Sequence, residues 1–169
     1  MRFLAVIWGI VGVSALLLRA IIGLSPRAFE AMGSGLSSTQ WAVLAGWTVF
    51  MLIAEGYRGF QKKFSPRTAA RVKYLRDHPT LLRTLLAPVF CMGFFHANRK
   101  TRTIAYYLTL GIIMLVLIVT FLCPQPWRGI IDFGVVLGLT WGLISFWIFT
   151  YQALTKTDYP HSPETPPKP

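Results

Sequence analysis

Three ionisable residues interrupt or border long apolar runs in this sequence: Arg19, Glu55 and Asp132. A charge inside a membrane span is costly, so such residues usually have a partner and mark an ion path, a proton relay or an assembly contact. If the first and last runs cross a bilayer in opposite directions, Arg19 and Asp132 lie at similar depth and are expected to pair. The alternative is that Arg19 extends to the headgroups while Asp132 is stabilised by its helix dipole.

Glu55 lies three residues before Arg58, at the expected inner end of the second apolar run. A catalytic carboxylate needs a second acid or a histidine within reach, and no neighbour in sequence supplies one. We therefore expect a local contact between Glu55 and Arg58. His78, His96 and His161 lack metal-ligand or haem-ligand spacing, and the sequence has no nucleophile elbow, phosphate-binding loop or zinc-protease motif. We expect no catalytic residue, no metal and no cofactor.

A basic stretch interleaved with aromatic residues follows Glu55. Each Lys or Arg near a membrane surface attracts anionic headgroups by ~1 kcal/mol, and aromatic rings insert at the boundary. The expected headgroup-binding residues are Arg58, Lys62, Lys63, Arg67, Arg71, Lys73 and Arg76. The alternative is that these charges only fix the topology. Although the net charge is +11, nucleic acid is not an expected partner, because the apolar stretch 81–95 interrupts the basic segment.

Small residues form stripes on the first and last apolar runs. Gly134, Gly138 and Gly142 repeat every four residues, and Gly9 and Gly12 form a shorter stripe on the first run. Small residues at this spacing let helix backbones approach closely in lipid. We expect these stripes to pack the first and last helices together, with homodimerisation as the alternative.

The elements that position these residues follow from the apolar runs. Hydrophobic residues make up 54% of the 169-residue chain and charged residues 14%, against about 25% charged in soluble domains. Runs of about 20 apolar residues match the ~30 Å hydrocarbon layer. The predicted fold class is therefore an all-α transmembrane bundle of four spans: residues 3–24, 39–55, 104–123 and 130–150. A cleaved signal peptide is the alternative for the first run, but the run is long for one and lacks a clear cleavage site.

The connecting segments have their own signals. Residues 25–38 are predicted to be a loop, and Ser37, Ser38 or Thr39 is expected to cap the next helix. A basic helix is expected over 66–77, followed by an interfacial or re-entrant helix over 81–95. Residues 1–155 then form one membrane domain with a basic loop over 56–103, and the Pro-rich tail 156–169 is expected to be disordered.

Orientation follows from the distribution of Lys and Arg. In the four-span scheme fourteen lie on one side and two on the other, so both termini and the 56–103 loop are predicted to be cytoplasmic. A bacterial inner membrane is the expected location. Cys91 and Cys123 fall at opposite membrane faces, so no disulfide is expected.

No motif in the sequence specifies a reaction. We expect an accessory, scaffold or assembly factor of a membrane complex, with anionic lipids and either a membrane protein or a second copy as partners. One alternative is a transporter or channel component that uses Arg19, Glu55 and Asp132. Another is a membrane enzyme that acts on lipid at the cytoplasmic interface through Glu55, Asp77, His78 or His96.

Overall fold

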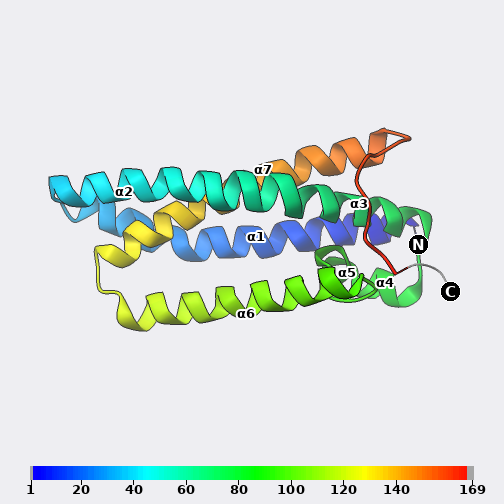
Figure 1. Cartoon of the computed structure of the whole chain (residues 1–169), viewed down its shortest axis with the longest axis horizontal. Helices are drawn as coiled ribbons and strands as arrows, with labels where there is room; N and C mark the ends of the chain where they lie inside the picture. The colour runs from blue at the N-terminus through cyan, green and yellow to red at the C-terminus, as the bar shows by residue number, and fades with distance from the viewer. Residues whose placement is uncertain (1, 167–169) are drawn as a thin grey trace.

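Residues 2–166 are described by a computed structural model in which long helices run along a common axis (Figure 1). Three of them are long and apolar enough to cross a membrane: α1 (Arg2–Gly33), α6 (Arg99–Leu122) and α7 (Trp127–Thr155). No strand occurs among the described residues. The all-helical class is therefore confirmed, and the length and apolar character of these three helices indicate an integral membrane protein.

Helix α1 is longer than the sequence predicted. It continues through Pro26 to Gly33, so the loop expected over 25–38 shortens to residues 34–37. The turn predicted at Ser25-Pro26 does not form, because this part of α1 packs against α7. Ala28 and Ala31 are buried, and Ala31 lies against Gly129 at the start of α7. Burial of an apolar face contributes more to helix formation than the propensity of single residues.

A second long helix runs without a break from residue 38 to residue 77 (Figure 1). It comprises α2 (Ser38–Met51), the π-helix η1 (Leu52–Phe64) and α3 (Ser65–Asp77), and its backbone stays helical at both junctions. Ser37 caps its start in a capping box with Gln40, as one of the three predicted cap residues. Residues 66–77 are helical in α3, as predicted, but the predicted start at Ser65-Pro66 is wrong, since the helix continues there from η1.

The segment 81–95 forms two short helices, α4 (Leu81–Leu85) and α5 (Ala87–Met92), where one helix was expected. Pro88 has no N–H to donate to the preceding turn, so the chain bends at Leu86. Gly93 ends α5 with a φ of 92°, a left-handed conformation that glycine adopts without strain.

Helix α7 is the centre of the bundle and packs against α1, α2, η1 and α3. The apolar core lies where α1, α3, α5 and α7 meet, and it includes Val13, Leu75, Phe90 and Phe146. The start of α1, helices α3 to α5 and residues 156–166 share this end of the long axis, whereas residues 34–37 and 123–126 lie toward the other end (Figure 1).

Helix α6 stands apart from this bundle (Figure 1). Thr101, Ala105 and Val119 are its buried residues, and every residue from 110 to 118 is exposed. Near its last turn, the Arg128 guanidinium donates to the Thr120 carbonyl and hydroxyl oxygens at 3.3 and 3.2 Å. Helix α6 is therefore attached near its ends and exposed on all sides in between.

Candidate functional site

Arg71 on α3 is the largest fully buried side chain among the described residues. Its guanidinium lies 4.2 Å from the centroid of the Phe90 ring and donates to four backbone carbonyls. The acceptors are Phe90 at 2.6 Å, Phe95 at 2.8 Å, His96 at 3.1 Å and Pro163 at 2.8 Å. Burial lowers the pKa of Arg71 to about 10, so the side chain remains charged at neutral pH. Arg71 therefore ties α3 to the α5–α6 connection and to the C-terminal segment.

Residues 156–166 lie along α3, although we expected the tail 156–169 to be disordered; residues 167–169 are outside the described part of the chain. Lys73 Nζ donates to the carbonyls of Lys156 and Thr157 at 2.8 and 2.6 Å. The Tyr159 hydroxyl donates to the Pro66 carbonyl at 3.1 Å. The cations of α3 thus bind main-chain oxygens of this segment, which apolar periodicity does not reveal.

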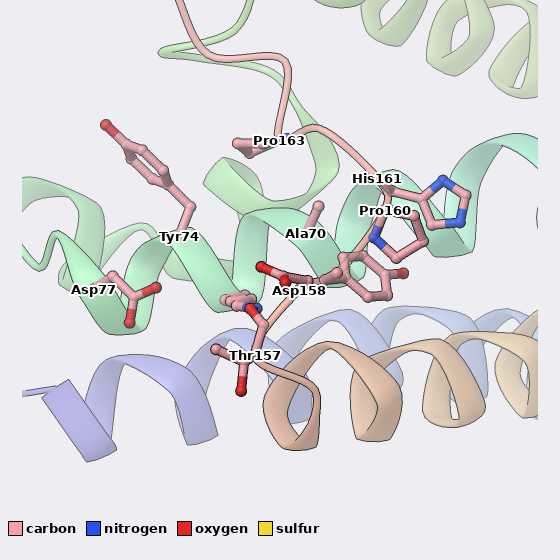
Figure 2. Close-up of a pocket in the computed structure, with 10 residues that line it drawn as sticks. Ala70, Tyr74, Asp77, Thr157, Asp158, Pro160, His161 and Pro163 are labelled. Carbon is pink, nitrogen blue, oxygen red and sulfur yellow. The ribbon is translucent and has the colours of Figure 1, made fainter.

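A pocket of about 390 Å³ lies between α3 and this segment (Figure 2). Tyr74 and Asp77 come from α3, while Asp158, His161 and Pro163 come from the C-terminal segment. Because the two elements each form part of the wall, the pocket exists only while the segment lies against α3. Asp77 and Asp158 give it carboxylates, but no cluster of three or more metal-ligating side chains occurs within residues 2–166.

Glu164 makes the polar contact that links this segment to α6. Its carboxylate accepts a hydrogen bond from the Thr101 hydroxyl and lies 3.8 Å from the Arg67 guanidinium. The Glu164 carbonyl accepts from the Asn98 amide at 2.8 Å, directly before α6 begins. Glu164 has a φ of 49°, a left-handed conformation that is unusual for a residue other than glycine.

The seven cations predicted to bind headgroups are placed in three different environments. Arg58, Lys62 and Lys63 are exposed on η1, as headgroup binding requires. Arg71 is not available, because it is buried and its donors are already bonded. The remaining three make intramolecular contacts: Arg67 with Glu164, Lys73 with the C-terminal segment, and Arg76 with Asp77 and the Leu154 carbonyl.

The structure does not bring Arg19 and Asp132 together. Asp132 is buried, and its carboxylate lies 4.0 Å from the guanidinium of Arg128, one turn earlier on α7. Arg19 is exposed and forms no ion pair within residues 2–166. The partner of Asp132 is therefore local, and only the i,i+4 spacing of Arg128 could have indicated it.

A double-mutant cycle separates the two pairings. Contacting residues couple by about 0.5–3 kcal/mol, and distant ones add almost independently. We expect Arg128→Leu and Asp132→Asn to couple in this range, whereas Arg19→Leu and Asp132→Asn add within about 0.5 kcal/mol. Both coupling energies are obtained from the free energies of unfolding of the single and double variants in detergent. Coupling at Arg19 without coupling at Arg128 would restore the pairing expected from the sequence.

Glu55 lies against the glycine stripe of α7 and not beside Arg58. A Cβ atom added to Gly138 would lie 2.9 Å from Glu55 Oε2. This oxygen is buried and has no hydrogen-bond partner among the described residues. The expected ion pair with Arg58 is not formed there, since Arg58 is exposed and has no salt bridge within residues 2–166.

The glycine stripes are packing surfaces, but their neighbours differ from those expected. Gly134, Gly138 and Gly142 are buried on α7, and they face the helix formed by α2 and η1. The facing side chains are those of Trp47, Glu55 and Phe60. Gly9 and Gly12 of α1 face Cys91 and Pro88 of α5. Helices α1 and α7 are in extensive contact through other residues.

The remaining candidates are scattered. His78 stacks on Tyr74, His96 accepts a 3.4 Å hydrogen bond from Arg83, and His161 lies in the C-terminal segment. The thiols of Cys91 and Cys123 are free. No protein-family model matches the chain, and neither a curated protein nor a solved structure matches it.

Proposed function

We propose that this protein is a four-span bacterial inner-membrane protein whose basic cytoplasmic end binds anionic phospholipid, as an accessory or assembly subunit of a membrane complex. The second span would be α2 with the first part of η1. Support comes from its position: Trp47, Glu55 and Phe60 lie successively along the glycine stripe of α7. A helix that lies along α7 in this way would cross the same layer as α7. Residues 38–54 contain no charged side chain.

The observation that supports lipid binding most directly is the exposure of Arg58, Lys62 and Lys63 beside aromatic side chains. Lys62 Nζ lies 4.6 Å from the centroid of the Tyr57 ring, and Tyr57 is itself 40% exposed. Exposed cations next to an aromatic ring suit a headgroup layer, where the ring enters the boundary and the cations meet phosphate.

The exposed leucines and the short lengths of α4 and α5 favour a position of residues 81–92 in the membrane interface over a segment that crosses the bilayer. Helix α4 and the residue after it expose four leucines at the basic end of the bundle: Leu81, Leu82, Leu85 and Leu86. Helices α4 and α5 are five and six residues long, far too short to span a bilayer. Exposed leucines beside a basic surface are typical of a segment that lies in the membrane interface.

Charge removal on η1 tests this proposal. Because each cation near the surface contributes ~1 kcal/mol, each neutralisation is expected to lower the affinity for anionic lipid about fivefold. The variant is Arg58→Gln with Lys62→Gln and Lys63→Gln. Native mass spectrometry of the protein in nanodiscs would compare retained phosphatidylglycerol with retained phosphatidylcholine.

The control is Arg27→Gln, which removes an exposed cation near the C-terminal end of α1, away from the basic end of the bundle. It should leave phosphatidylglycerol retention at the wild-type level. Equal retention of both lipids by the wild-type protein would refute lipid-charge recognition. Mass spectrometry of proteins that remain bound after purification in mild detergent would test the accessory role.

A further inference from the structure

We propose that the corner between α3 and the start of α6, now occupied by the Glu164 carboxylate, is a binding site for a phosphate group, and that Glu164 is its built-in competitor. This inference rests on the proposed function, because it names the site at which the anionic headgroup is held. The recognised chemistry is a phosphate oxygen, supplied either by a lipid headgroup or by a free phosphate ion.

The donors around Glu164 suit phosphate at least as well as carboxylate. The Thr101 hydroxyl and the Arg67 guanidinium both contact the Glu164 carboxylate. Arg67 has a further donor, Nε, that is buried and has no partner among residues 2–166. A guanidinium with a free donor can bind a second oxygen, and phosphate offers more acceptor oxygens than carboxylate does.

The surroundings of this corner hold more positive charge than one carboxylate neutralises. The guanidinium groups of Arg71 and Arg83 both lie over the Phe90 ring, at 4.2 and 5.8 Å from its centroid. Arg67 is one turn before Arg71 on α3. Helix α6 begins at this point, and its cap residue Asn98 makes no side-chain capping bond, so the positive end of the helix adds to the attraction for an anion.

The Glu164 carboxylate can be replaced by another anion, because it lies on the solvent side of Arg67. The Glu164 side chain is 41% exposed, whereas that of Arg67 is 16% exposed, so the carboxylate covers the cation from the solvent side. The neighbouring bonds from Arg71 and Lys73 go to main-chain carbonyls, so they hold the segment without using its carboxylate. A phosphate group can therefore displace the carboxylate alone.

The experiment compares Glu164→Gln with Asp158→Asn in the full chain. Both variants remove one negative charge from the same segment, but Asp158 is exposed and forms no salt bridge within residues 2–166. We expect Glu164→Gln to raise phosphatidylglycerol binding about fivefold or more, the lower end of typical site-to-site coupling. Asp158→Asn should stay near the wild-type value. Adding Arg67→Gln to Glu164→Gln should abolish the gain.

Two probes distinguish the sources of phosphate. Phosphatidylglycerol in nanodiscs tests the headgroup, and inorganic phosphate titrated against the protein in neutral detergent tests the free ion. A gain with the lipid alone assigns the site to headgroups, and a gain with both assigns it to the phosphate group as such. Equal effects of Glu164→Gln and Asp158→Asn, or no effect of either, would overturn the site. If the wild-type protein still prefers phosphatidylglycerol to phosphatidylcholine in that case, the proposed function survives.

Discussion

Replacement of Arg71 with leucine is expected to lower the free energy of unfolding by ~3 kcal/mol or more, a larger loss than any other single change at the basic end. The guanidinium is buried and bonds four backbone carbonyls. Each buried polar group left without a partner costs ~1–3 kcal/mol. Arg71→Lys should also be destabilising, because an ammonium has three donors and lacks the planar reach of the guanidinium.

The measurement is unfolding of the purified protein in detergent, with Arg58→Leu as the matched control. Arg58 is exposed, so the same substitution there should change stability by less than about 0.5 kcal/mol. Hydrogen exchange should show that Arg71→Leu also releases the amide of Asn98, which donates to the Glu164 carbonyl. An Arg71→Leu protein as stable as Arg58→Leu would contradict the role of Arg71 as the connection between these three segments.

Substitution of alanine at Gly134 or Gly142 should separate α7 from the helix formed by α2 and η1. An added Cβ atom would lie 2.6 Å from Cδ1 of Trp47 at the first position and 2.6 Å from Cδ1 of Phe60 at the second. Both distances are shorter than carbon atoms tolerate, and both facing groups are rings. Overpacking of this kind costs ~1–3 kcal/mol.

Gly46 and Gly111 provide the matched controls, since a Cβ atom at either position meets nothing within 4 Å. Alanine there should be neutral or should stabilise the helix by up to ~1 kcal/mol, the difference in helix propensity. Unfolding of all four alanine variants in the same detergent gives the comparison. If the two pairs were equally stable, the close approach along the glycine stripe would be refuted.

The features that follow from periodicity alone could be predicted. Long uncharged runs predict helices, and the end predicted at His78-Pro79 is confirmed, because α3 ends at Asp77. The start predicted at Ser65-Pro66 is wrong, because the helix already runs through this point from η1. The small stripe on α7 was recognised, because four-residue spacing places glycines on one face. The helix that packs against this stripe was not predicted. The sequence shows which face of a helix carries small residues, but it does not show which helix packs against that face.

The contacts of the candidate site left little signal in the sequence. Arg71 occurs in a run of cations that pattern analysis treats as one exposed surface, and its acceptors are backbone carbonyls, which every residue has. Glu164 lies in a Pro-rich tail without apolar periodicity, yet it reaches Thr101 and Arg67. Pairings over such separations depend on the fold. The i,i+4 spacing of Arg128 and Asp132 is visible in the sequence and predicts a local ion pair. We instead expected Asp132 to pair with Arg19 on another helix.

The isolation of α6 has a mechanical consequence. A stiff rod that is joined to the bundle near its two ends adjusts to a thinner or thicker bilayer by tilting, the usual response to hydrophobic mismatch. Near its C-terminal end, α6 is held by the Arg128–Thr120 contact. Near its N-terminal end it is held at Thr101, which donates a hydrogen bond to Glu164. We therefore expect a change in acyl-chain length to shift Thr101 and, through its hydrogen bond, the Glu164 carboxylate.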